Sequence, residues 1–213
     1  MVLLTFLTLV AAWRLLPPVS TIMLARHALL RPVERSWMPL DRLGTALPAA
    51  VVMSEDGQFC RHHGVDWPAL GLVLDQAGAD GPARGASTIA MQTAKNLYLW
   101  PQRSFLRKGL EIPMALIIDA AWPKRRVLEV YLNIAEWGDG RFGAEAAARR
   151  YFGKSAAALT APEAALLAAA LPNPLLRNPS RPKRRHAALA RVIALRMREA
   201  EPWLDCLKPP ASP

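Results

Sequence analysis

The sequence predicts an all-α domain that follows an N-terminal membrane anchor. From Pro48 onward, apolar residues recur at helical spacing almost throughout, whereas alternating strand patterns are scarce. Residues typical of helix N-termini precede most of these apolar segments. The 213 residues are enough for one domain with a sizeable core, and a composition of 52% hydrophobic and 21% charged residues excludes global disorder.

Residues 1–24 are interpreted as a single membrane anchor and residues 25–46 as a juxtamembrane linker with an amphipathic piece. No charge precedes Arg14, although the uninterrupted apolar run is shorter than the roughly 20 residues that span a bilayer. A signal peptide and a start site placed too late in the sequence are the alternatives. The nearby arginines all follow the apolar run, so the positive-inside rule taken literally would place the domain in the cytoplasm.

The first helices of the domain are marked by residues that suit an N-terminal turn. Pro48 fits the first turn of a helix whose apolar start is formed by residues 49–53, and Asp66 can cap the next helix. Ser87 and Thr88 are cap residues in front of a third helix.

The later helices have similar boundary signals. Ser104 opens a helix that Pro113 could kink, and Pro123 opens the next one. Thr160 and Glu163 form a capping-box pattern before a helix that is apolar on nearly all sides and therefore expected to be buried. One helix is expected to begin near residue 48, and others are expected over residues 66–74, 89–99, 104–121, 123–136, 144–151, 164–171 and 186–200. The domain spans 47–200 and precedes a tail over 201–213.

The net charge of the protein narrows the classes of partner that it could bind. Lysine and arginine total 27 against 17 acidic residues, a net charge of +10, which favours a nucleic acid, an anionic membrane or a phosphate-bearing substrate. No nucleic-acid motif accompanies this charge, so no nucleic-acid partner is expected.

The sequence contains two cysteines, Cys60 and Cys206, which are too few for a disulfide-dense scaffold. They could form a bridge, but two unrelated free thiols are the preferred interpretation.

Glu55 and Asp56 are adjacent acids at the end of the first apolar helix, beside His62 and His63. A carboxyl group half-desolvated against apolar neighbours has its charged form disfavoured, so its pKa would rise toward the range useful for proton transfer. The alternative is a solvated helix end with a histidine cap. The adjacent histidines lack the i, i+4 spacing of a zinc-binding helix.

A second segment places polar side chains along one helix. Gln92, Lys95 and Asn96 are spaced i, i+3, i+4 and therefore share a face. The N-cap residues Ser87 and Thr88 precede them, at a helix terminus that favours anions. This row could bind sugar hydroxyls or a phosphate, although an ordinary capped helix with a polar surface is the simpler interpretation.

Two further segments are basic. Arg103, Arg107 and Lys108 could neutralise a pyrophosphate beside Glu111, although Arg107 and Glu111 also have the spacing of a simple helix salt bridge. In the segment from Lys124 to Asn133, an apolar stripe is expected to pack in the core. Structural roles are expected there for Glu129 and Asn133.

Taken together and in order, these four segments resemble the peptidoglycan glycosyltransferase family, which polymerises the lipid-linked cell-wall precursor lipid II. The resemblance covers roughly residues 48–180, and Met91 replaces a family glutamine. The chain looks like a monofunctional biosynthetic transglycosylase, related to the glycosyltransferase domain of class A penicillin-binding proteins. The matching residues are Glu55, Asp56, Phe59, His62, Gly64, Gly85, Ser87, Thr88, Ile89, Gln92, Lys95, Asn96, Arg107, Lys108, Glu111, Lys124, Leu128, Glu129, Tyr131, Leu132 and Asn133.

The resemblance implies a lysozyme-like helical fold with an extended cleft near the membrane. It also implies a single-pass protein of the cytoplasmic (inner) membrane whose catalytic domain lies on the periplasmic face. We follow this implication over the charge bias, because large domains are translocated largely regardless of flanking charge. Cell-division or elongation proteins of wall synthesis could be its partners.

The resemblance further implies inverting transfer of a growing glycan from undecaprenyl pyrophosphate to the 4-hydroxyl of lipid II. Glu55 would be the general base, and Glu111 would hold the cationic cluster, assist departure of the leaving group or bind a divalent metal. No tightly bound cofactor is expected, although Mg²⁺ or Mn²⁺ could take part. The residues expected to bind substrate are Asp56, Ser87, Thr88, Gln92, Lys95, Asn96, Arg103, Arg107 and Lys108.

Two other functions fit part of the sequence. A lytic or hydrolytic cell-wall glycosidase also uses two carboxylates, but it has no need of the Lys/Arg cluster. A non-catalytic scaffold of wall synthesis would bind lipid II without turning it over. At Met91 the thioether cannot replace an amide donor, but methionine is an easy filler if the position faces the core.

Overall fold

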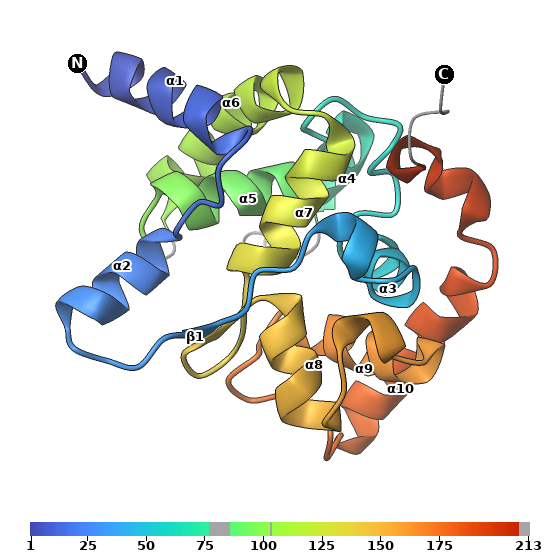
Figure 1. The fold of residues 1–213 in the computed structure, drawn as a ribbon. Coiled ribbons are helices and arrows are strands. Elements are labelled where there is room, and N and C mark those ends of the chain that lie inside the picture. The colour runs from blue at the N-terminus through green and yellow to red at the C-terminus, as the bar shows by residue number, and fades with distance from the viewer. Residues whose placement is uncertain (77–85, 103, 209–213) are drawn as a thin grey trace, which may run out of the picture.

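The computed structural model describes residues 1–76, 86–102 and 104–208, which form a mostly helical domain (Figure 1). Helices α5, α6 and α7 pack together in one part of the molecule, and α3, α9 and α10 pack together in another. Helix α8 contacts both α7 and α9 and so joins the two parts. The bounds of the helices are α1 Val2–Trp13, α2 Thr21–Ala28, α3 Ala46–Glu55, α4 Trp67–Gln76, α5 Ile89–Tyr98, α6 Phe105–Ala121, α7 Lys124–Ile134, α8 Ala144–Phe152, α9 Ala161–Ala170 and α10 Arg184–Met197.

The predicted cap residues begin the helices as expected. The hydroxyl of Thr88 accepts the Met91 N–H at the start of α5, and that of Ser104 accepts the Arg107 N–H at the start of α6. Asp66 accepts the Ala69 N–H at α4, and α9 begins with the capping box expected at Thr160. Helix α6 continues through Pro113 to Ala121.

Helix α9 is buried on nearly all sides, as its sequence predicts. Its side chains are mostly alanine, and small side chains let α3 and α10 approach its backbone closely. His186 of α10 is buried and its Nε2 lies 2.8 Å from the Leu166 carbonyl oxygen of α9, which fixes the two helices relative to each other.

A small sheet departs from the all-helical expectation. Strand β1 (Glu34–Arg35) pairs in parallel with β3 (Arg141–Phe142), which pairs antiparallel with β2 (Glu136–Gly138). Helix α7 therefore ends at Ile134, and the expectation that it reaches Glu136 is wrong. Strands of two or three residues are too short to show an alternating pattern, which is why the sequence did not reveal them.

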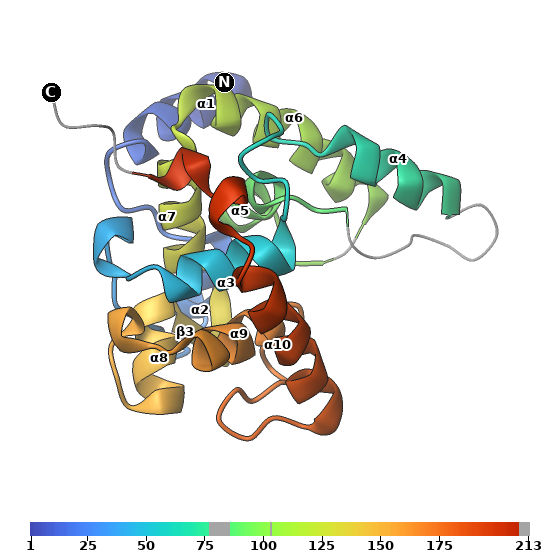
Figure 2. The same cartoon turned by 90° about the vertical axis from the view of Figure 1, so that its right-hand side faces the viewer.

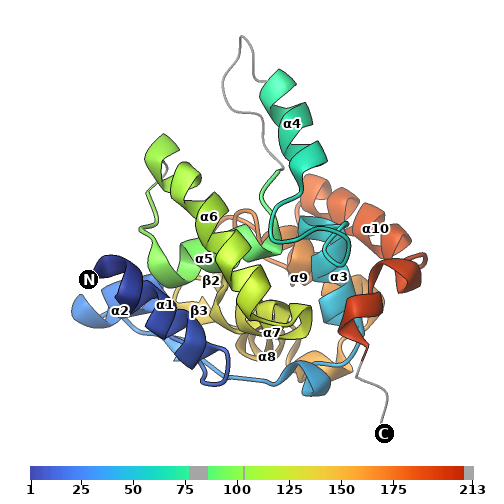
Figure 3. The ribbon, with the colours of Figure 1, turned by 90° about the horizontal axis from the view of Figure 1, so that it is seen from above.

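The N-terminal helix α1 lies against α6 (Figure 3). The indole N–H of Trp122 donates to the Val10 carbonyl over 2.8 Å, and Arg126 donates to the carbonyls of Trp13 and Leu16. Carbonyls at a helix C-terminus lack intrahelical partners, so Arg126 caps α1. Within the three described ranges, the helices fall short of the length and apolar character that crossing a membrane requires.

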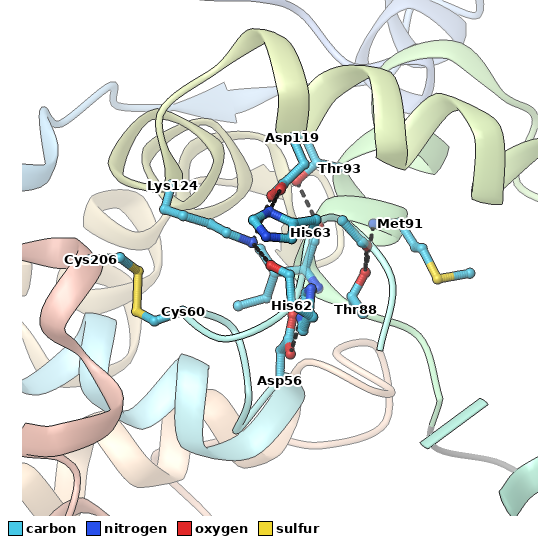
Figure 4. Close-up of polar contacts among 12 residues, drawn as sticks. Asp56, Cys60, His62, His63, Thr88, Met91, Thr93, Asp119, Lys124 and Cys206 are labelled. Atoms are coloured by element: carbon cyan, nitrogen blue, oxygen red, sulfur yellow. Dashed lines mark hydrogen bonds and ion pairs between the residues drawn. A yellow bond between two sulfur atoms is a disulfide. The ribbon is translucent and has the colours of Figure 1, made fainter. Parts of the chain in front are cut away.

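The chain after α10 returns to the loop that follows α3, and Figure 2 shows this segment passing alongside α3. Cys206 of this segment forms a disulfide with Cys60, across a sequence separation of 146 (Figure 4). The preferred interpretation of two free thiols is therefore wrong. The two cysteines are brought together by contacts between distant segments: Arg61 lies over the Trp203 ring, and Arg125 binds the Leu207 carbonyl.

We predict that the disulfide contributes substantially to stability, because it closes a long loop in the unfolded chain. The double variant Cys60→Ser/Cys206→Ser should unfold with a free energy about 2–4 kcal/mol lower than wild type. Thermal melting with and without a reductant is the measurement. The reductant should lower the melting temperature of the wild type only; equal effects on both proteins would contradict a structural bond.

Candidate active site

Glu55 is the last residue of α3, and its half-buried carboxylate lines a cavity of about 400 Å³. Helix α3 ends there because Asp56 leaves the helical conformation, with φ −161° and ψ 71°. The cavity lies between the end of α3, the start of α5 and the C-terminal part of the chain. Its walls are formed by Met53, Ser54, Glu55, Asp56, Gly57, Gln58, Asp66, Ala69, Ala86, Ser87, Thr88, Arg196 and Trp203.

A chain of hydrogen bonds fixes the Glu55 side chain. The Tyr131 hydroxyl donates to Gln92 Oε1 over 2.9 Å, and Gln92 Nε2 donates to Glu55 Oε2 over 2.9 Å. Among the residues that the structure describes, the other oxygen, Oε1, accepts only a long 3.3 Å bond from the Ser54 hydroxyl. One carboxylate oxygen is thus held by the protein while the other remains available for a substrate proton.

The pKa of Glu55 is raised above its ordinary value, as the sequence predicts. Burial, which disfavours the charged form, is the larger effect, and the bonds from Gln92 and Ser54 and the charges of Lys95 and Arg177 oppose it. A carboxyl group with a raised pKa is a stronger base once ionised, which suits it to remove a proton.

Asp56 holds the elements of the site together. Its Oδ2 accepts the Ile89 N–H at the N-terminus of α5 over 2.9 Å, and its Oδ1 lies 2.8 Å from His62 Nε2 (Figure 4). A carboxylate at a helix N-terminus is favoured by the helix dipole. Both oxygens of Asp56 are therefore engaged within the protein.

A hydrogen bond between Thr88 and Gly64 lies next to the Asp56 contacts and joins the start of α5 to the loop that follows α3. The Thr88 hydroxyl donates to the Gly64 carbonyl over 2.6 Å while it caps α5. Gly64 has a φ of +79°, and a Cβ there would lie 2.7 Å from the Ala115 carbonyl oxygen. Only glycine fits this position, because it tolerates both the left-handed backbone and the close approach of α6. Lys124 supports the same loop by donating to the His62 carbonyl.

The predicted cationic cluster forms around Glu111 on α6. Arg107 pairs with one oxygen of Glu111, and Lys108 Nζ lies 3.2 Å from the other. Lys108 also donates to the Ser87 hydroxyl over 2.5 Å, which joins α6 to the segment before α5. Arg103 lies outside the described residues, as does Gly85.

Lys95 interacts electrostatically with the carboxylates of both Glu55 and Glu111. Burial lowers its pKa, while the charges of Glu111 and Glu55 oppose that shift and those of Arg107 and Lys108 add to it. The site thus brings Glu55, Gln92 and Lys95 together with the cluster around Glu111. Asn96 is buried, and its backbone carbonyl accepts a bond from the Thr21 hydroxyl of α2.

The residues around Glu111 fit ion pairing better than a divalent metal. Each of its oxygens faces a cation, and the described residues contain no group of three or more His, Cys, Asp or Glu side chains that could hold a metal ion. Divalent metals in proteins are usually held by several such ligands.

Glu129 and Asn133 have the structural roles expected of them. Glu129 accepts the Leu40 N–H, and Asn133 exchanges hydrogen bonds with both backbone groups of Met38. These contacts tie residues 38–40 to α7.

Sequence reasoning missed three contributors to the site. Tyr131 was expected only in the core, yet its buried hydroxyl reaches Gln92. Arg177 was not assigned to the site, yet its charge favours the ionised form of Glu55. Trp203 was assigned to the tail and instead lines the cavity. Their distance along the chain from Glu55 left no local signal.

Met91 is completely buried in the core. We predict that Met91→Gln changes catalytic turnover by less than about tenfold, or roughly 1.4 kcal/mol, because Met91 is not among the residues that line the cavity. The buried amide should lower the free energy of unfolding by about 1–3 kcal/mol. Chemical denaturation and a polymerisation assay measure the two effects. Met91→Leu is the matched control, and a large gain in activity for glutamine alone would contradict the core assignment.

Comparison with known proteins agrees with this geometry. A family model described as Transglycosylase matches residues 23–198. A protein of Brucella suis biovar 1 (strain 1330) is 56% identical over 203 residues, which cover 95% of this chain and 91% of that protein. One of Rhodospirillum centenum is 54% identical over 92% of this chain and 86% of its own length. Both are named biosynthetic peptidoglycan transglycosylase. The chain therefore belongs to the transglycosylase family.

Proposed function

We propose that this protein polymerises lipid II into linear glycan strands, with Glu55 as the general base. The observation that carries the proposal is a half-buried carboxylate of raised pKa, which lines a cavity and neighbours a lysine and a cationic cluster. The chain is a peptidoglycan glycosyltransferase, in agreement with its family and with the name of its relatives.

Glu55 would take the proton from the 4-hydroxyl of the acceptor sugar. A sugar hydroxyl is a weak nucleophile at neutral pH, so removal of this proton assists its attack on the anomeric carbon of the donor. The new glycosidic bond forms as the bond to the undecaprenyl pyrophosphate breaks, with inversion of the α linkage to β. Gln92 would keep the carboxylate oriented, because it already holds Oε2.

Negative charge develops on the departing pyrophosphate. Lys95, Arg107 and Lys108 would stabilise this charge, and Arg103 would join them on the strength of the sequence pattern. Glu111 would keep Arg107 and Lys108 in position through its two ion pairs. The buried setting supports this role, because electrostatic interactions are stronger where water is excluded.

The remaining predicted substrate-binding residues form two groups: those that could contact the substrate and those whose polar atoms already bind other groups of the protein. Ser87 lines the cavity and Asn96 shares a helix face with Gln92 and Lys95, so they would hold sugar or phosphate oxygens. Asp56 and Thr88 would act through other residues, since their polar side-chain atoms already bind other groups of the protein.

The domain would act on the outer face of the cytoplasmic membrane. The disulfide supports this location, because disulfides persist mainly in oxidising compartments. The disulfide therefore favours the periplasmic location of the domain that the family resemblance implies over the cytoplasmic location suggested by the positive-inside rule. Residues 1–24 would associate with the membrane, and wall-synthesis proteins of division or elongation would be partners.

We predict that Glu55→Gln lowers the rate of lipid II polymerisation by at least about 100-fold, because general base catalysis contributes a factor of that order. The control is Glu136→Gln. Burial also raises the pKa of Glu136, but its carboxylate binds Gly140 N and lies near Arg26, outside the cavity. This control should retain wild-type rates within about twofold. Polymer from the Glu55 variant at wild-type rate would remove Glu55 from its role.

We further predict that Gln92→Leu moves the acid limb of the pH–rate profile to higher pH. The Gln92 bond stabilises the ionised carboxylate, so its loss raises the pKa of Glu55 further. A base must be deprotonated to act, and activity should therefore fall away at a higher pH in the variant than in wild type. Initial polymerisation rates across a pH series measure the shift. A shift to lower pH, or an unchanged limb, would contradict the assignment.

A further inference from the structure

The segment after α10 forms one wall of the Glu55 cavity. Trp203, in the short 3₁₀ helix Glu201–Trp203, lines the same cavity as Glu55, Gln58 and Asp66. The transglycosylase family model ends at residue 198, so this wall lies beyond the part of the chain that the family defines.

Several contacts hold this wall in place. The guanidinium carbon of Arg61 lies 4.3 Å from the Trp203 ring centroid, and three residues further on Cys206 is bonded to Cys60. Arg61 and Cys60 belong to the loop that also carries His62, the partner of Asp56. On the other side, Arg125 of α7 binds the Leu207 carbonyl. The loop beside Glu55 and the segment that carries Trp203 are thus covalently joined.

The composition of the cavity matches a sugar. The flat apolar face of an aromatic ring packs well against the C–H groups of a pyranose, while carboxylates, amides and arginine bind its hydroxyls. Among the described residues that line this cavity, Trp203 supplies the only aromatic ring, and Asp66, Gln58 and Arg196 supply polar groups.

We propose that Trp203 contacts a sugar ring of the substrate beside Glu55, and that the Cys60–Cys206 disulfide positions it there. This inference rests on the proposed function for the identity of the substrate. It adds a binding residue outside the family-defined domain and gives the disulfide a role in the site as well as in stability.

The test of Trp203 separates binding from chemistry. Trp203→Ala should raise KM for lipid II by about tenfold with kcat changed less than about threefold, because a contact made equally in ground and transition states affects KM alone. Trp203→Phe keeps an aromatic ring, so its KM should lie close to that of wild type. Unchanged KM in a folded Trp203→Ala protein would overturn the proposal.

A binding measurement distinguishes this proposal from the proposed function. The soluble N-acetylglucosaminyl–N-acetylmuramyl pentapeptide disaccharide is titrated into Glu55→Gln protein, with and without Trp203→Ala. Kd should rise by about tenfold with the tryptophan change. Trp67→Ala, a change at an exposed tryptophan outside the cavity lining, is the control and should leave Kd unchanged. Weaker binding without any polymer from wild type would sustain the role of Trp203 and defeat the proposed function; equal binding would defeat the role of Trp203.

The disulfide is tested by reduction with dithiothreitol, which adds two electrons and two protons to the bond and leaves two thiols. Wild type should then show the raised KM of Trp203→Ala, at a temperature where melting shows that the reduced protein is folded. Cys60→Ser/Cys206→Ser should show the same KM without the reductant and no further change with it. If KM of folded, reduced wild type is unchanged, the disulfide does not position Trp203.

Discussion

The carboxylate of Asp56 is the contact on which the site depends. It accepts the first N–H of α5 and binds His62, so one side chain sets the end of α3 against the start of α5. Glu55 precedes it on α3, and Gln92 lies one turn into α5. The 2.9 Å bond between Glu55 and Gln92 therefore joins the same two helices that Asp56 holds together. Since the side chain of Asp56 is almost completely buried, its charge is desolvated, and these hydrogen bonds are needed to compensate for that cost.

Burial acts in opposite directions on two charged groups of the candidate site. It raises the pKa of the Glu55 carboxyl and lowers that of the Lys95 ammonium, so each group is closer to neutrality than it would be in water. Their mutual attraction opposes both shifts. A site of this kind responds strongly to an additional charge, because little solvent is present to screen it. In the proposed reaction, a pyrophosphate beside Lys95 would favour the charged form of that lysine, which is the form that would stabilise departure.

The sequence predicts local features well and distant contacts poorly. Thr88, Ser104 and Thr160 cap helices through bonds to residues three positions away, so their roles follow from short patterns. The raised pKa of Glu55 could also be predicted, because its apolar neighbours lie on the same helix. The partners of Asp56 and Glu55 on α5 are 33 and 37 residues away, and only the ordered family motifs hinted that these segments meet. No such motif connects Cys60 with Cys206, and the disulfide between them was therefore not the preferred interpretation.

The wide separation of the two bridged cysteines has a consequence for how the protein matures. A ribosome adds about 5–20 residues each second, so roughly 7–30 s pass between the appearance of Cys60 and that of Cys206, 146 residues later. During that interval Cys60 has no native partner, and the loop beside Glu55 lacks its opposite wall. A nascent or prematurely terminated chain would carry every residue of the catalytic motifs yet hold an incomplete binding cavity. Completion of the chain and oxidation of the two thiols are thus both needed before the cavity has all of its walls.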